Sequence, residues 1–218
     1  MATKPPQKEA IEISGQAGSI ECLLETPAEL APRGKALICH PHPLHGGTMQ
    51  NKVAHTLARA AVDCGLAAMR FNFRGVGASA GVHDNGFGER DDALLVADYL
   101  NQRFDGPIVF AGFSFGGGVA TEIARRQLPV ALVTAAPAVD RWERDADWQQ
   151  PACPWLIVHG DADELVDVDA VVSFVDGLSP GPELLVMPEV SHFFHGQLVE
   201  LRTTVTAFIN AALGGTSV

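Results

Sequence analysis

The stretch Gly112-Phe113-Ser114-Phe115-Gly116 decides the fold, because it separates two segments of different periodicity. Before it, the apolar run at 108–111 follows a proline and predicts a buried strand. After it, apolar residues recur at helical spacing over 119–124. Ser114 is therefore expected on a turn so sharp that only tiny neighbours fit, as in a nucleophile elbow. The structural alternative is that Ser114 only caps the helix N-terminus, but an ordinary N-cap does not explain the three glycines at 116–118. The pattern favours Ser114 as a nucleophile.

The alternation of strands and helices continues outward from this motif in both directions. Apolar runs that predict strands buried on both faces occur at 35–39, 67–73, 130–133, 155–158 and 184–187. Helical spacing is found at 51–64, 91–103, 169–178 and 196–213. Near the N-terminus, residues 11–13 and 20–25 alternate at period two and predict an antiparallel hairpin. The predicted fold class is therefore α/β, with a doubly wound, mostly parallel sheet and this N-terminal hairpin at its edge.

The chain has the length of one domain. Its 218 residues, of which 47% are hydrophobic, are enough for one sizeable hydrophobic core but too few for two domains that each have a core of that kind. We expect a flexible tail at 1–10 and a single domain over 11–218. The connection at 137–153 is too short to form a lid domain, so the fold is expected to be lidless.

Charge and cysteine content limit the classes of partner. A formal net charge of −11 argues against a nucleic-acid surface, which needs clustered Lys and Arg. The first ten residues are polar, and no run approaches the roughly 18 apolar residues of a membrane helix. The four cysteines have no short paired spacing, which is typical of reduced thiols. We expect a cytoplasmic protein with no membrane or nucleic-acid partner; the sequence does not indicate an oligomeric state.

A serine nucleophile needs a histidine base, and the histidine needs an orienting carboxylate. In a doubly wound sheet the reactive loops follow the carboxyl ends of strands. His159-Gly160-Asp161-Ala162-Asp163 follows the strand at 155–158, and His192 follows the strand at 184–187. His195 is a less favourable base, because it stands where the last helix begins. The order Ser114, Asp, His192 is one of three known triad orders. Asp161 and Asp163 are both close enough in sequence to supply the carboxylate.

These motifs together resemble the α/β-hydrolase superfamily, and in detail its small lidless bacterial serine hydrolases related to the dienelactone-hydrolase type. The residues that carry the resemblance lie at 40–52 (HPHPLHGGTM with Asn51 and Lys52), 70–79 (RFNFRGVGAS), 112–116, 159–163 and 191–194. Dienelactone hydrolases have a cysteine where this chain has Ser114. The resemblance implies hydrolysis of a carboxylic ester through an acyl-enzyme. It also implies that Asp163, the last residue of His-Gly-x-x-Asp, is the triad acid rather than Asp161.

The resemblance further implies an oxyanion hole of two backbone N–H groups. One is that of Phe115, the residue after the nucleophile, and the other comes from the loop after the 35–39 strand. Pro41 and Pro43 have no N–H, which leaves His42 or Leu44. We favour His42, because it stands where the residue after the usual His-Gly pair would be.

Two other readings of the motifs are weaker. The histidines at 40, 42 and 45 are separated by prolines and cannot lie on one regular face, so we expect no metal site. The stretch 75–80 matches a dinucleotide-binding pattern, but a long glycine-rich loop follows where a helix should open, so we expect no cofactor. Arg74 is instead expected to pair with Asp91 or Asp92.

The predicted function is hydrolysis of a short acyl ester by Ser114, His192 and Asp163, with a small-molecule ester as substrate. A thioesterase or a peptidase remains possible within the same chemistry. A catalytically silent protein that binds a ligand on the same fold is the alternative from another class.

Overall fold

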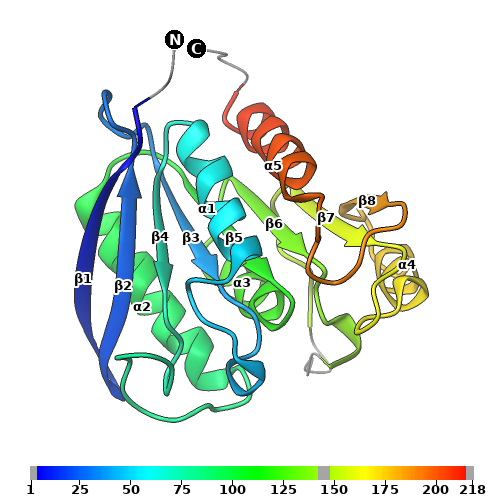
Figure 1. The fold of residues 1–218 in the computed structure, drawn as a ribbon, viewed down its shortest axis with the longest axis horizontal. Coiled ribbons are helices and arrows are strands. Elements are labelled where there is room, and N and C mark those ends of the chain that lie inside the picture. The colour runs from blue at the N-terminus through cyan, green and yellow to red at the C-terminus, as the bar shows by residue number, and fades with distance from the viewer. Residues whose placement is uncertain (1–3, 142–147, 215–218) are drawn as a thin grey trace.

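An eight-stranded sheet with helices on both faces forms the body of the computed structural model, which describes residues 4–141 and 148–214 (Figure 1). The strands are β1 (Gln7–Gly15), β2 (Gly18–Thr26), β3 (Lys35–Cys39), β4 (Ala67–Phe71), β5 (Ile108–Phe113), β6 (Ala131–Ala135), β7 (Trp155–Gly160) and β8 (Glu183–Met187). Their spatial order is β1-β2-β4-β3-β5-β6-β7-β8. The β1–β2 and β2–β4 pairs are antiparallel, and the other neighbouring pairs are parallel. The predicted fold class is confirmed.

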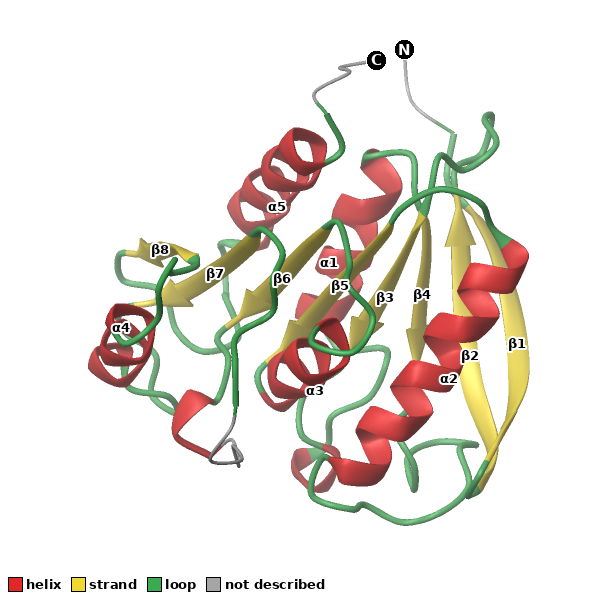
Figure 2. Cartoon of the chain, turned by 180° about the vertical axis from the view of Figure 1, so that it is seen from behind, coloured by secondary structure: helices red, strands yellow, loops and turns green. Residues whose placement is uncertain are grey.

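The helices divide between the two faces of the sheet. They are α1 (Lys52–Asp63), α2 (Phe87–Arg103), α3 (Phe115–Ala124), α4 (Val168–Asp176) and α5 (Leu198–Ala212), with short 3₁₀ turns η1 (Pro43–His45) and η2 (Val139–Arg141). Figures 1 and 2 show α1 and α5 on one face and α2, α3 and α4 on the other. Within the described ranges, none of these helices combines the length and the apolar character that crossing a bilayer requires.

The central strands are mostly apolar because both of their faces are covered. Every residue of β3, β4, β5, β6 and β7 is buried. Successive side chains point to opposite faces, so Phe110 and Ile157 pack on the side of α2, α3 and α4. Their neighbours Val109 and Val158 pack on the side of α1 and α5. The sheet is thus the shared wall of two apolar cores.

Two elements begin earlier than the sequence pattern indicates. β1 starts at Gln7, inside the stretch 1–10 that we assigned to a tail, and its first residues are exposed at the sheet edge, so they show no apolar alternation. α2 starts at Phe87 rather than at residue 91. Its first turn is fixed by Glu89, whose carboxylate accepts the Gly86 N–H at 2.9 Å.

The topology brings three loops to one edge of the sheet. Because β5, β7 and β8 are parallel, their carboxyl ends lie together, and the chain leaves each strand on the same side. The described residues of the 136–154 connection between β6 and β7 form no lid domain. The loops that carry Ser114, Asp163 and His192 therefore meet at this edge of the sheet.

Candidate active site

Ser114 lies on the turn between β5 and α3, in a backbone conformation that few residues adopt. Its φ is +54° and its ψ is −120°, a sparsely populated region for a residue with a Cβ. Such a conformation costs on the order of 1–3 kcal/mol and persists only where the surrounding structure imposes it. Here the Ser114 N–H donates to the Ala135 carbonyl of β6 at 2.9 Å. The strained turn lifts the serine hydroxyl above the end of the sheet.

Gly112 and Gly116 make this turn possible because no side chain fits at either position. A Cβ on Gly112 would lie 2.0 Å from the Gly116 carbonyl oxygen. A Cβ on Gly116 would lie 2.3 Å from the carbonyl oxygen of His40, at the end of β3. Helix α3 therefore starts in direct backbone contact with the central strands.

His192 stands beside the serine in the loop after β8. Its Nε2 lies 3.1 Å from Ser114 Oγ, and its Nδ1 lies 2.7 Å from Asp163 Oδ2. The imidazole is almost fully buried, at 3% exposure, and its ring centroid lies 5.0 Å from that of Phe113. His195, the alternative base, contacts the Phe193 ring instead. The structure thus brings together Ser114, His192 and Asp163 from three separate loops.

The carboxylate of Asp163 is held from both sides. Its Oδ1 accepts the N–H groups of Leu165 at 2.8 Å and Val166 at 2.9 Å, and its Oδ2 faces His192. Burial by itself raises the pKa of Asp163, but the hydrogen bonds from His192, Val166 and Leu165 outweigh it and hold the pKa below its ordinary value. Asp163 is therefore an ionised acceptor at neutral pH.

Asp161, the other aspartate of the same loop, has a different partner. Its Oδ1 accepts the N–H of Glu189 at 2.6 Å, which ties the end of β7 to the loop after β8. Glu189 has a positive φ of 59°, so this bond secures a tight turn three residues before His192. The geometry gives Asp161 a loop-forming contact.

The two predicted oxyanion donors lie near the serine, one in the loop after β3 and the other at the start of α3. Phe115 is the first residue of α3, so its N–H has no acceptor within the helix. The Leu44 N–H donates to Nδ1 of His42 at 3.2 Å. The His42 carbonyl accepts the N–H groups of His45 and Gly47. Leu44 is therefore already engaged in a local turn.

Side chains at the end of β4 and directly after it hold the loop after β3 in place, a role that the sequence did not disclose. The buried Arg70 pairs with the buried carboxylate of Glu25 at 3.0 Å and also donates to the Met49 carbonyl. Asn72 accepts the Met49 N–H at 2.8 Å and donates to Glu21. Both polar groups of the Met49 backbone are thus fixed by Arg70 of β4 and by Asn72, the residue after the strand. The signal in the sequence was a pair of polar residues, two positions apart, in an otherwise apolar run.

His40 has a structural place at the end of β3. Its Nδ1 donates to the Pro41 carbonyl at 2.7 Å and its Nε2 accepts the Phe73 N–H at 3.0 Å. Burial lowers the pKa of His40 to about 4, although the bond to Pro41 acts in the opposite direction. Both ring nitrogens of this neutral imidazole therefore have a hydrogen-bond partner.

Arg74, in the loop after β4, forms an ion pair with Asp92 through two hydrogen bonds of 2.8 Å each.

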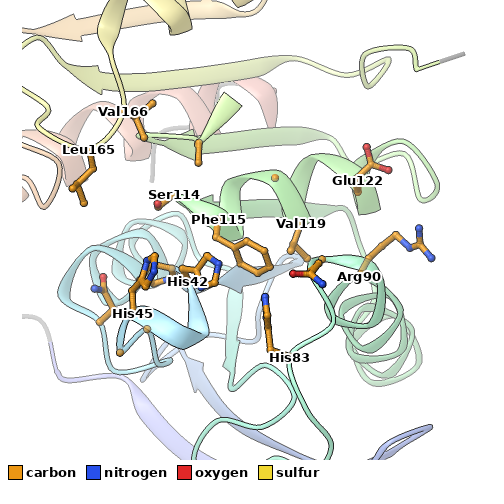
Figure 3. Close-up of a pocket in the computed structure, with 18 of the residues that line it drawn as sticks. His42, His45, His83, Arg90, Ser114, Phe115, Val119, Glu122, Leu165 and Val166 are labelled. Atoms are coloured by element: carbon orange, nitrogen blue, oxygen red, sulfur yellow. The ribbon is translucent and has the colours of Figure 1, made fainter. Parts of the chain in front are cut away.

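A pocket of about 370 Å³ opens beside the serine (Figure 3). Figure 3 shows the rings of His42, His83 and Phe115 clustered next to Ser114, with Arg90 and Glu122 farther along. The His42 centroid lies 4.9 Å from both the His83 and the Phe115 centroids. The charged side chains among the lining residues are Arg90, Glu122 and Arg126. The pocket is thus lined mainly by aromatic rings and small residues near the Ser114 hydroxyl.

Comparison with known families places the chain among hydrolases. The model of the family described as serine aminopeptidase, S33, matches residues 31–151. An uncharacterised protein, RP471, from Rickettsia prowazekii (strain Madrid E) is 33% identical over 184 residues, which cover 80% of this chain and 77% of the relative.

Solved structures share the whole fold. An alpha-beta serine hydrolase homologue from Coxiella burnetii is 43% identical, with a TM-score of 0.86 over 91% of this chain and 96% of that one. XC6422 from Xanthomonas campestris, described as an α/β serine hydrolase without lid, is 38% identical, with a TM-score of 0.90 and 100% coverage of both chains. The Pyrococcus furiosus esterase Pf2001 is 17% identical, with a TM-score of 0.78 over 94% and 93%, a likeness that shows the fold alone. A specific relation to dienelactone hydrolases stays a prediction.

Proposed function

We propose that this chain, which belongs to the α/β-hydrolase superfamily through the family described as serine aminopeptidase, S33, is a serine esterase that hydrolyses carboxylic esters of short acyl groups. One observation carries the proposal. A continuous set of contacts runs from Ser114 Oγ through both nitrogens of His192 to the ionised carboxylate of Asp163, at 3.1 Å and 2.7 Å. A serine hydroxyl with no base is a weak nucleophile, and this arrangement supplies the base.

The contacts assign a role to each side chain. His192 Nε2 accepts the proton of Ser114 while Oγ attacks the acyl carbon of the ester. Asp163 accepts the Nδ1–H of His192, which keeps the imidazole in the tautomer that leaves Nε2 unprotonated, and it stabilises the imidazolium that forms. The imidazolium then gives its proton to the leaving alcohol. A water molecule, activated by the same nitrogen, releases the acid from Ser114.

The tetrahedral intermediate carries a negative oxygen that needs preorganised donors. We assign this role to the backbone N–H groups of Phe115 and His42. The position of Phe115 at the first turn of α3 supports the first donor. The place of His42 in the pocket beside Ser114 supports the second donor.

The shape of the pocket supports a short acyl group. Its volume of about 370 Å³ is near the lower end of the usual range of ligand pockets, roughly 300–1,000 Å³. The described residues supply no lid that could cover a long chain. A long acyl chain would leave most of its methylenes in water.

The family description favours a peptide bond as the second candidate function. An aminopeptidase needs a carboxylate that holds the ammonium group of its substrate. Glu122 is the acidic side chain among the lining residues, and its two oxygens already accept bonds from Arg125, Arg126 and Trp148. This saturation favours the ester over the peptide.

The proposal is tested by measuring the hydrolysis of an ester, a thioester and an amide of the same short acid. We expect the ester to be cleaved fastest after correction for intrinsic reactivity. Cleavage of the amide or the thioester alone would replace the ester assignment, and cleavage of none of them would favour a protein that only binds.

A further inference from the structure

His159 is a buried histidine that the proposed mechanism does not use. It is the residue before the last one of β7 and has no solvent exposure. Four residues later comes Asp163, the carboxylate assigned to the triad. The imidazole of His159 contacts the loop that carries this carboxylate.

The contacts of His159 fix its tautomer. Its Nε2 lies 3.0 Å from the Val166 carbonyl oxygen and 3.5 Å from Asp163 Oδ2. Both of these oxygens can only accept, so the proton of the neutral ring is on Nε2. Burial lowers the pKa of His159, which keeps the ring neutral although the Val166 carbonyl and Asp163 act in the opposite direction.

The second ring nitrogen shows that this histidine is not a simple space filler. Nδ1 is buried and has no hydrogen-bond partner among the described residues. Burying an acceptor without a partner is unfavourable, and an apolar side chain would fill the same space without this cost. The feature that sets the imidazole apart at this position is therefore its Nε2–H.

We infer that His159 is a positioning residue that holds the Asp163 carboxylate in line with His192. The connection runs through Val166, whose carbonyl accepts from His159 Nε2 and whose N–H donates to Asp163 Oδ1 at 2.9 Å. The same Nε2–H also faces Oδ2, the oxygen that binds His192. One donor thus fixes the loop that orients the carboxylate and adds partial positive charge beside it. This inference rests on the proposed function.

Two amide substitutions separate the N–H from the rest of the ring. In His159→Gln, the amide nitrogen can reach the place of Nε2. In His159→Asn, the shorter side chain places its amide near the place of Nδ1. His159→Leu removes all donors and serves as the apolar reference. The Gln and Asn variants are both polar and uncharged, so they form a matched pair.

Steady-state kinetics on an ester that the wild-type protein hydrolyses, with thermal melts on each variant, test the inference. We expect kcat to fall about tenfold in His159→Asn and His159→Leu with KM unchanged, as for the loss of one hydrogen bond, here that to the Val166 carbonyl. We expect kcat of His159→Gln to stay within about twofold of the wild-type value, because the glutamine amide keeps a donor at the place of Nε2. The proton resonance of His192 Nδ1–H should move in the Leu variant and stay in place in the Gln variant.

Equal kcat values for Gln and Asn, or losses of kcat that follow the loss of thermal stability, would overturn the inference. A wild-type protein that hydrolyses no ester and does not react with a fluorophosphonate would instead remove the proposed function. A reactive wild type with fully active His159→Leu would remove only the role of His159.

Discussion

Nδ1 of His192 lies 2.7 Å from Oδ2 of Asp163, whereas the carboxylate of Asp161, two residues earlier in the same loop, binds the Glu189 N–H. One loop thus presents two aspartates to two different partners. Substitutions at these two positions can therefore compare the proposed catalytic role of Asp163 with the structural role of Asp161.

Replacement of these aspartates by asparagine should have unequal effects. Asp163→Asn would donate to His192 instead of accepting from it and would favour the wrong tautomer, so we expect kcat to fall on the order of 10⁴-fold, as in the best-studied triad. Asp161→Asn keeps an oxygen acceptor for Glu189 and should cost far less. Steady-state kinetics with thermal melts on both variants measure this, and a larger loss of kcat at Asp161 would reverse the assignment.

Acyl chain length should have a limited effect on specificity. Each CH₂ that the pocket buries contributes about 0.8 kcal/mol, and each one that stays in water contributes nothing. The pocket of about 370 Å³ has no covering lid in the described residues, so kcat/KM should stop rising after a few carbons. Esters of one alcohol with acyl chains of graded length measure this dependence. A steady rise to long chains would contradict the prediction.

The nucleophile turn should not tolerate a methyl group at Gly116. Its Cβ would meet backbone carbonyl oxygens at 2.3 and 2.4 Å, which no side-chain rotation relieves. We expect Gly116→Ala to destabilise the fold by at least about 1–3 kcal/mol, the usual range for overpacking, and to lower activity. Gly177→Ala is the control, since its Cβ would have only ordinary contacts at 3.5 Å. Equal melting temperatures for the two variants would contradict this account.

Stability should fall as the pH is lowered from about 6.5 toward about 4 because of His40. Burial lowers its pKa to about 4 in the folded protein, while the unfolded chain has the ordinary value near 6.5. Between these values the unfolded state binds more protons, so the free energy of unfolding rises with pH. The pKa of Asp163 is also lowered, but a lowered carboxylate pKa acts at more acidic pH than this window. Urea unfolding at several pH values gives the free energy of unfolding as a function of pH, and this free energy should change less with pH in His40→Asn. An unchanged pH dependence would exclude His40 as its source.

The sequence was sufficient for the fold because the strands and helices differ in period. The buried strands read as continuous apolar runs, and the hairpin reads as alternation. The start of β1 could not be predicted, because an edge strand with exposed Gln7, Lys8 and Glu9 has no apolar pattern. The start of α2 was hidden by Gly88, a poor helix former that has no room for a side chain beside Arg74.

Candidate site residues could be named from the sequence, but their contacts could not. The order of Ser114, Asp163 and His192 follows from strand and loop positions, whereas the choice between two aspartates depends on loop geometry. The clamps on Met49 from Arg70 and Asn72 are long-range contacts that no local pattern discloses. The same holds for His159, which a sequence shows only as one histidine at the end of an apolar strand.

Covalent labelling of Ser114 tests the central claim most directly. A fluorophosphonate reacts with a serine only if a base activates it. We expect the wild-type protein to gain the mass of one probe, located by peptide mapping at Ser114. Ser114→Ala should gain none and lose ester hydrolysis while keeping its melting temperature, because the hydroxyl lies at the pocket surface. A wild-type protein that stays unlabelled, or a Ser114→Ala variant that hydrolyses esters near the wild-type rate, would contradict the account.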